Sequence, residues 1–275
     1  MIPEPAMSGL KRAAAARFDP YSAVAMHIQL CFGDLIAAEG TAFAWLENDQ
    51  PFLITNWHNV TGKDPNTGLH LSAKSTEPDR LVLSAHADMP TVGTRPVTIM
   101  LRQDNGAPKW LIHPEHGRKV DVVAIPLSPN DLQGTGAQIL FLNVLRNTRL
   151  LTKIGMDVYV LGFPFGKGGV GFPIWKRASI ASEPNIGELR LLIDTASRKG
   201  MSGSPVIQRS WGEVRLEEGD ESGFAIATFA GPVTKFIGVY SGRLRTKNPE
   251  DIQLGIVWPA PLVQEIVAGN RWDTE

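Results

Sequence analysis

The sequence predicts an all-β protein, and three observations carry that prediction. Short runs rich in Val, Ile, Leu, Thr and Phe follow one another from Tyr21 onward, and Gly, Pro, Asn or Asp separates each run from the next. Such runs, bounded by turn residues, are typical of strands. No long helical period alternates with them, which disfavours an α/β fold. A single amphipathic stretch near the C-terminus, 259–267, predicts a helix.

The chain divides into four parts by local composition. Residues 1–20, with three prolines and an alanine run, predict a loosely held arm. Stretch 128–152 lacks β-branched alternation and is the best candidate for a connection, so we expect β-units at 21–131 and 153–275 joined through 132–152. The acidic stretch 211–223 predicts a solvated loop or hairpin tip. Strands are expected at 28–32, 40–45, 52–56, 80–84, 97–101, 120–127, 157–161, 178–181, 189–194, 205–208, 235–240 and 254–257.

Composition excludes some classes of function. The 275 residues suffice for a substantial core, and a formal net charge of -1 provides no attraction to nucleic acid or an anionic membrane. The only cysteine, Cys31, cannot form an internal disulfide, and we expect it to be an inert core thiol. No signal-like segment and no run of about 18 apolar residues is present. We therefore expect a cytoplasmic protein with no nucleic-acid or membrane partner.

The sharpest chemical signal is a serine flanked by glycines at 199–206, KGMSGSPV, directly before an apolar strand. A serine that attacks a carbonyl needs backbone N–H groups directed at the oxygen that becomes negative, and glycine permits the required tight backbone. Gly200 and Ser202 would donate those two amides, and Gly203 would leave room for a substrate. An ordinary Gly–Ser turn before a strand is the alternative.

Two further residues lie at the edges of apolar runs. His58 ends the run 52–57, and an imidazole titrates in the range that suits proton transfer from serine. Asp121 lies just inside the apolar run 120–127, where a buried carboxylate requires a hydrogen-bonding partner. A structural histidine and a capping aspartate are the alternatives. The order His, Asp, Ser is nevertheless one of the known orders of the hydrolytic triad.

These segments resemble the three catalytic blocks of trypsin-like serine peptidases, especially the bacterial branch that includes glutamyl endopeptidases and HtrA proteases. The resemblance rests on 55–60 (TNWHNV), 120–125 (VDVVAI) and 200–205 (GMSGSP), with support from 160–164 (VLGFP) and 237–242 (IGVYSG). It implies two perpendicular six-stranded β-barrels followed by a C-terminal helix. It also implies a serine endopeptidase with a catalytic triad of His58, Asp121 and Ser202, and an oxyanion hole at Gly200 and Ser202.

The resemblance further implies that segments 195–199 and 240–243 form the walls of the pocket that receives a substrate side chain. The substrate-binding candidates there are Thr195, Ala196, Lys199, Tyr240, Ser241 and Gly242. Two departures limit the analogy. Met201 replaces the usual Asp or Asn, so activation by an ion pair with a freed N-terminus is not available. Tyr240 replaces the histidine with which glutamyl endopeptidases recognise glutamate. Lys199 or Arg243 could favour acidic substrates, but solvated rim charges are the preferred interpretation of both.

Proteolysis of this kind requires no metal or organic cofactor. His113 and His116 lie close in sequence, but a proline interrupts them and their spacing lacks the helical register of a zinc site, so we expect a surface loop. The expected partners are a protein or peptide substrate and, as regulator, a further protein. Two other functions stay open: a catalytically silent binding module with a protease fold, and an esterase-like hydrolase that uses the same triad.

Overall fold

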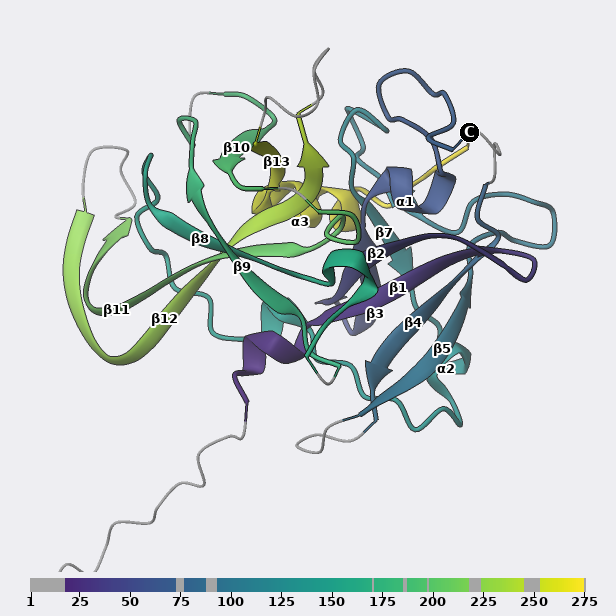
Figure 1. The fold of residues 1–275 in the computed structure, drawn as a ribbon, viewed down its shortest axis with the longest axis horizontal. Helices are drawn as coiled ribbons and strands as arrows, with labels where there is room; N and C mark the ends of the chain where they lie inside the picture. Colours follow the sequence, from purple (N-terminus) through teal and green to yellow (C-terminus); the bar gives the residue numbers. More distant parts are fainter. Residues whose placement is uncertain are drawn as a thin grey trace, which may run out of the picture.

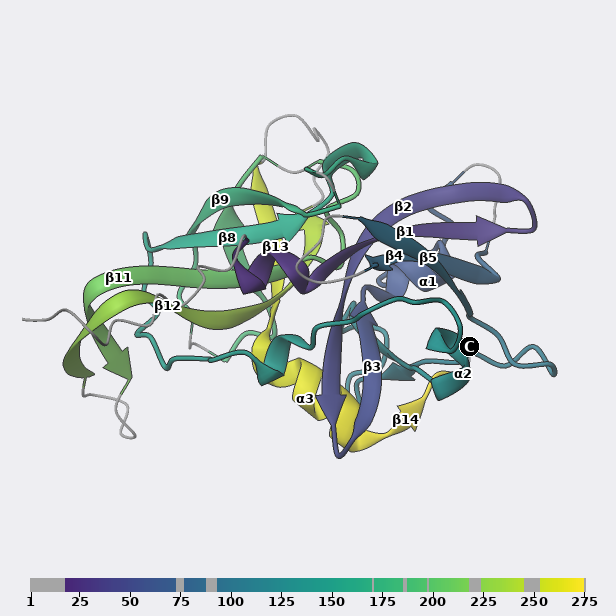
Figure 2. The same ribbon diagram turned by 90° about the horizontal axis from the view of Figure 1, so that it is seen from below.

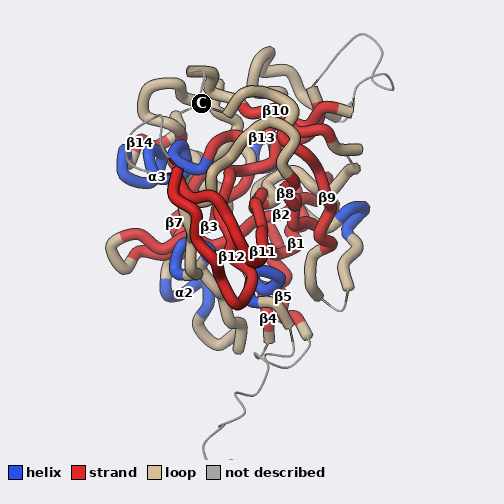
Figure 3. The backbone as a smooth tube through the Cα atoms, turned by 90° about the vertical axis from the view of Figure 1, so that its left-hand side faces the viewer, coloured by secondary structure: helices blue, strands red, loops and turns tan. Residues whose placement is uncertain are grey.

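The computed structural model describes residues 18–72, 77–87, 93–169, 171–184, 187–196, 198–217, 224–244 and 253–274. The arm expected at 1–20 lies almost wholly outside the described residues. Strands dominate the described chain (Figure 3), so the all-β expectation is confirmed. Each of the expected strand ranges overlaps an observed strand.

The N-terminal part forms a sheet of eight strands in the order β14-β6-β7-β3-β2-β1-β4-β5. The strands are β1 Ala25–Phe32, β2 Leu35–Glu47, β3 Gln50–Thr55, β4 Arg80–His86, β5 Thr94–Met100, β6 Leu111–Ile112, β7 Val123–Pro126 and β14 Arg271–Trp272. Neighbouring strands run antiparallel throughout. The resemblance implied six strands here. The sheet has two more because β6 and β14, of two residues each, extend it beyond β7.

The C-terminal part forms a ring of six antiparallel strands in the order β10-β13-β12-β11-β8-β9. The strands are β8 Asp157–Gly162, β9 Ile174–Ile180, β10 Leu191–Asp194, β11 Pro205–Glu217, β12 Phe224–Arg243 and β13 Leu254–Pro259. The long β11–β12 hairpin curves away from the rest of the molecule on the left of Figure 1. Buried apolar side chains from all six of these strands fill the interior of the ring.

The loop expected at 211–223 requires a correction. Residues 211–217 continue β11 and pair with β12, with Val214 opposite Ala227, and 218–223 lie outside the described residues. Buried and exposed side chains alternate here, as they do along a strand with one face in contact with the protein. Val214 is buried against Leu150 and Val233, whereas Glu213 on the other face is exposed. Glu213 therefore lies on the solvent face of a hairpin arm and not in a loop.

Short helices connect the strands. They are η1 Pro20–Ala23, α1 Trp57–Thr61, α2 Pro129–Leu132, η2 Leu142–Val144, η3 Pro164–Gly166 and α3 Ala260–Gly269. Helix α3 confirms the expected C-terminal helix. Its buried residues Leu262 and Ile266 share an apolar cluster with Phe43 of the sheet and Phe236 of the ring, so α3 packs against both parts (Figure 2).

The C-terminus returns to the N-terminal sheet. Strand β14 pairs with β6, and the carboxylate of Asp273 accepts hydrogen bonds from Trp57 Nε1 and Trp110 Nε1, each at 2.8 Å. The expected unit 153–275 therefore needs a correction at its end, because residues 271–273 pack on the sheet formed mainly by 25–126. Satisfying two buried indole N–H groups explains why this segment packs against the sheet.

Candidate functional site

His58 is positioned by a one-turn helix at the end of β3. The helix α1 begins at Trp57, which is 2% exposed and anchored to Asp273, and it ends at Gly62, whose left-handed backbone (φ 68°) directs its N–H to His58 O. Glycine adopts this conformation without steric cost. His58 thus follows a buried anchor on a short rigid turn.

Asp121 lies two residues before β7, not inside the strand as expected, and its carboxylate is buried. Oδ1 accepts a hydrogen bond from the backbone N–H of His58 at 2.9 Å, while Oδ2 lies 2.6 Å from His58 Nδ1 and accepts from Ser241 Oγ at 2.5 Å. Asn56 Nδ2 donates to the backbone oxygen of Asp121 at 2.6 Å. An ionised carboxylate can only accept, so His58 carries its hydrogen on Nδ1 and the lone pair of a neutral ring lies on Nε2.

Ser202 lies between two glycines that no other residue could replace. Gly200 has φ 89° and Gly203 has φ 86°. A Cβ at Gly200 would lie 2.2 Å from Phe163 O, and one at Gly203 would lie 2.0 Å from Thr41 O. Within the described chain, the amides of Gly200 and Ser202 donate no hydrogen bond. Two N–H groups next to the serine are therefore available to a ligand oxygen.

The sheet and the ring meet at Ser202. Its backbone oxygen accepts from Thr41 N at 2.8 Å and from Asn59 Nδ2 at 3.2 Å, and Asn59 is the residue after His58. Ser202 Oγ lies 3.9 Å from the point that a Cβ on Gly242 would occupy. No hydrogen bond joins Ser202 Oγ to the His58 ring in the described part of the protein. The three predicted residues thus gather at one junction, without a direct bond between serine and histidine.

Burial and hydrogen bonds hold the described residues just before Ser202. Met201 is 1% exposed and packs in the apolar interior of the ring. Thr41 Oγ1, from β2, donates to Gly200 O at 2.8 Å, and Phe165 N donates to Lys199 O at 2.7 Å. Apolar burial of Met201 and a hydroxyl from the sheet therefore both contribute to holding this loop.

The remaining predicted residues divide into two groups. Ser241 Oγ donates a hydrogen bond to Asp121 Oδ2, while Gly242 lies beside Ser202 Oγ. Tyr240 is 1% exposed: its ring lies in the interior of the ring of strands, and its backbone bonds to Gly203 and Ser204. Thr195 is buried, Ala196 is half-buried and Lys199 is exposed.

Sequence reasoning missed several supporting residues. Asn56, Asn59 and Thr41 each bind the backbone of a predicted catalytic residue or of its neighbour. Lys176, on β9, donates to Thr195 Oγ1 at 2.9 Å. Only the asparagines carried a local signal, since they flank Trp57-His58. The partners of Thr41 and Lys176 are distant in sequence.

His113 and His116 lie side by side, and His113 is buried. His113 is 2% exposed, lies 2.8 Å from Glu265 Oε2 through Nε2, and stacks on His116, so the surface-loop expectation is wrong for His113. Among the described residues, no group of three His, Cys, Asp or Glu side chains could hold a metal ion. In the same residues, no helix is long and apolar enough to cross a membrane.

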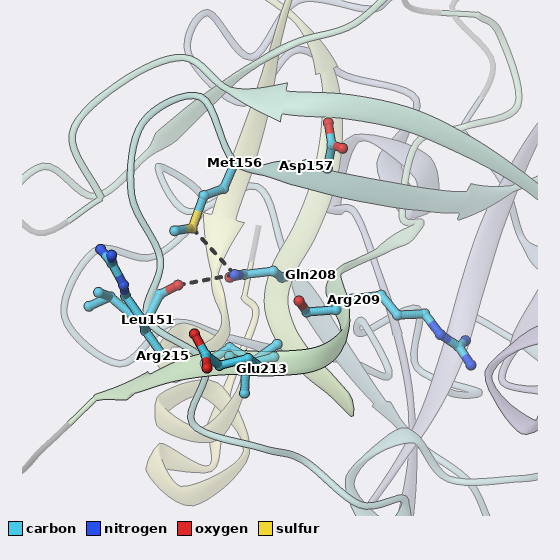
Figure 4. A pocket seen from close by; sticks show the side chains of 10 residues that line it. Leu151, Met156, Asp157, Gln208, Arg209, Glu213 and Arg215 are labelled. Atoms are coloured by element: carbon cyan, nitrogen blue, oxygen red, sulfur yellow. Dashed lines mark hydrogen bonds between the residues drawn. The ribbon is translucent and has the colours of Figure 1, made fainter. Parts of the chain in front are cut away.

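A hollow of about 370 Å³ lies away from the candidate site, between the start of β8 and the base of the β11–β12 arm. Gln208 crosses it to bond Leu151 O at 3.0 Å and to approach Met156 Sδ at 3.5 Å (Figure 4). None of the predicted catalytic or substrate-binding residues lines this hollow.

Comparisons with known proteins give distant likenesses. No family model and no curated protein matches the chain. Among solved structures, it is similar to a serine endoprotease from Yersinia pestis (13% identity, TM-score 0.47), over 90% of this chain and 62% of that one. It is also similar to the Rv3671c protease from M. tuberculosis in its active form (18% identity, TM-score 0.47), over 92% and 83% of the two chains. Likenesses this distant carry no conclusion about activity or substrate.

Proposed function

We propose that the protein is a trypsin-like serine endopeptidase with His58, Asp121 and Ser202 as its triad. In this proposal β1–β5 and β7 correspond to the first of two perpendicular six-stranded barrels, and the ring of β8–β13 corresponds to the second. The glutamyl endopeptidase and HtrA proteases remain the nearest branch by motif.

One observation carries the proposal. A buried carboxylate accepts from both the backbone and the imidazole of His58, and the serine that meets this turn from the other part of the molecule has two amide donors beside it. A structural carboxylate alone would not require an adjacent serine with unused N–H groups. Nucleophile, base, orienting acid and oxyanion donors are the parts that acyl transfer needs.

The reaction follows from these positions. Ser202 Oγ attacks the scissile carbonyl carbon as His58 Nε2 takes its proton, and the oxygen that becomes negative accepts from the amides of Gly200 and Ser202. His58 then protonates the leaving amine, and an acyl-enzyme remains on Ser202. Water, deprotonated by His58, releases the acid product. Asp121 holds the imidazole with hydrogen on Nδ1 and stabilises the imidazolium, while Ser241 fixes the carboxylate.

The silent binding module is the second candidate, and the missing hydrogen bond between Ser202 Oγ and His58 favours it. In unliganded enzymes, however, catalytic hydrogen bonds are often long and tighten only when substrate binds. The same geometry therefore suits a resting peptidase.

Covalent labelling separates the two candidates. A fluorophosphonate probe should label wild-type protein at Ser202, with labelling lost in Ser202→Ala and strongly reduced in His58→Ala. Ser210→Ala, a matched serine on β11, should label like wild type. Cleavage of casein and of a peptide library would then establish peptidase activity, and turnover of small esters alone would indicate an esterase. Absence of labelling in folded wild-type protein would refute the proposal.

A further inference from the structure

A partly exposed carboxylate lies beside the residues that precede Ser202. Glu39 and Thr41 are two positions apart on β2, so their side chains lie on the same face of the strand. On that face, Thr41 Oγ1 donates to Gly200 O at 2.8 Å and accepts from Phe163 N at 3.3 Å. Glu39 therefore faces the same part of the ring as Thr41, and 37% of its side chain is still exposed to a ligand.

The short helix η3 links this carboxylate to Gly200. A Cβ on Gly166 would lie 2.5 Å from Glu39 Oε2 and 2.7 Å from Glu39 Oε1, so the carboxylate rests directly on the backbone of Gly166. A Cβ on Gly200 would in turn lie 3.3 Å from Gly166 N. Phe165 N donates to Lys199 O at 2.7 Å, which holds η3 against the residue before Gly200. Gly166 thus contacts both the Glu39 carboxylate and the glycine whose amide is a proposed oxyanion donor.

The charge of Glu39 lacks a strong cationic partner. Among the described residues, no lysine or arginine forms an ion pair with it, and its nearest basic group is His27 Nε2 at 3.6 Å. Burial lowers the pKa of His27 from its usual 6.5, so this imidazole is uncharged at neutral pH. The exposed carboxylate oxygens are therefore available to a cationic ligand.

The sheet and the ring approach Ser202 from different sides. Gly242, from the ring segment that would receive substrate before the cleaved bond, lies beside Ser202 Oγ. Strand β2 reaches Ser202 from the sheet, where Thr41 N donates to Ser202 O at 2.8 Å. A peptide that enters along 240–243 and continues past Ser202 towards the sheet meets β2 and η3 with the residues that follow the cleaved bond.

We propose that Glu39 is a specificity residue whose carboxylate binds a lysine or arginine side chain of the substrate, at the first or second position after the cleaved bond. This inference rests on the proposed peptidase function. It assigns no preference to the residue before the bond, whose walls are the segments 195–199 and 240–243. An ammonium or guanidinium group would supply the cation that Glu39 lacks, whereas a neutral side chain of the same shape would not.

Acyl transfer measures this side of the site separately from the other. An acyl-enzyme formed from an ester substrate can pass its acyl group to an added amine instead of to water. The amine nitrogen bonds to the acyl carbon, the bond from that carbon to Ser202 Oγ breaks, and His58 carries the proton from the amine to Ser202 Oγ. Argininamide and glycyl-argininamide place a cation at the first and second positions, and their citrulline analogues are neutral controls of the same shape.

At one of these positions, the arginine compound should accept the acyl group about three- to tenfold more efficiently than its citrulline analogue in wild-type protein. The ratio should fall towards 1 in Glu39→Gln and below 1 in Glu39→Lys. Glu213→Gln removes an exposed strand glutamate outside the site and should keep the wild-type ratio. Wild-type ratios near 1 at both positions, or an equal loss for arginine and citrulline compounds in Glu39→Gln, would overturn the inference.

A binding measurement distinguishes failure of this inference from failure of the proposed function. In Ser202→Ala protein, fluorescent octapeptides with a central arginine or a central citrulline should differ in affinity by a similar factor, and Ser202→Ala/Glu39→Gln should abolish the difference. If wild-type protein does not react with fluorophosphonate but this difference persists, the peptidase proposal fails and Glu39 remains a cation-binding residue. Equal affinities would overturn the role of Glu39, whatever the labelling shows.

Discussion

The sheet and the ring hold their parts of the site by different means. In the sheet, side-chain hydrogen bonds do this: the Asp121 carboxylate accepts twice from His58, and Asn56 binds the Asp121 backbone. The carboxylate also accepts from Ser241 of the ring. In the ring, backbone shape does it: Ser202 lies between two glycines in left-handed conformations, next to buried Met201. A network of charged hydrogen bonds loses its function when one partner changes charge, even if the size of the side chain is kept. A strained backbone turn tolerates no added atom.

The largest effect should come from changing charge in the polar network. Asp121→Asn keeps the size of the side chain but places an amide NH2 where His58 Nδ1–H must find an acceptor, which favours the wrong imidazole tautomer. We expect kcat to fall on the order of 10⁴-fold with little change in the thermal unfolding midpoint. Asp104→Asn, an exposed aspartate, is the control. Retained activity in Asp121→Asn would remove this residue from the triad.

The next effect tests the backbone turn. In Gly200→Ala, the added Cβ meets Phe163 O at 2.2 Å and moves the amide that would stabilise the oxyanion, so kcat should fall by about 10² to 10³. Gly106→Ala is a matched control, because Gly106 has φ 82° with no atom within 4 Å of the new Cβ. This control measures the cost of placing an alanine in a left-handed backbone conformation where its Cβ meets no other atom. Comparable activity losses in both variants would show that backbone strain, and not the site, explains the effect.

A smaller effect should come from the hydroxyl that joins the two parts. Thr41→Val removes the hydrogen bond to Gly200 O, which should reduce kcat/KM by about three- to tenfold. Thr41→Ser keeps the hydroxyl and should restore most of the activity. A change in kcat rather than in KM would support a positioning role. If valine and serine variants were equally impaired, the packing of the Thr41 methyl group would matter more than its hydroxyl.

The smallest effect concerns stability at low pH. All six histidines lie on the sheet side of the chain, before residue 120. Burial lowers the pKa of His27 from its usual 6.5, against the opposing charge of Glu39, and burial likewise lowers that of His86. The unfolded chain therefore binds protons before the folded one does. Stability is complete above the unfolded value and declines as the pH falls below about 6.5 towards the lowered folded values.

Urea unfolding between pH 7.5 and 5 measures this decline. His86→Gln should flatten the pH dependence of the unfolding free energy, even if it lowers stability at neutral pH. The same slope in wild type and variant would show that His86 does not contribute to the loss.

Local patterns predicted much of the architecture. Every expected strand range was found because alternation, β-branched residues and turn residues act over a few neighbours. The errors are of two kinds. The two-residue strands β6 and β14 are too short to leave a pattern, and the strand at 211–217 was obscured by acidic residues on its solvent face. The start of β7 was placed too early, since an apolar run does not reveal where pairing begins.

The residues of the candidate site also divide into those with a local sequence signal and those without one. His58, Asp121 and Ser202 were identifiable because each stands in a short, chemically unusual context, and their catalytic roles remain predictions. Thr41, Lys176 and Asp273 were not identifiable, and for Ser241 the bond to Asp121 was not, since their partners lie far away in sequence. A chain shows which residue types could do chemistry. Which hydroxyl, cation or carboxylate completes the site depends on contacts that form only when the sheet, the ring and the C-terminus pack together.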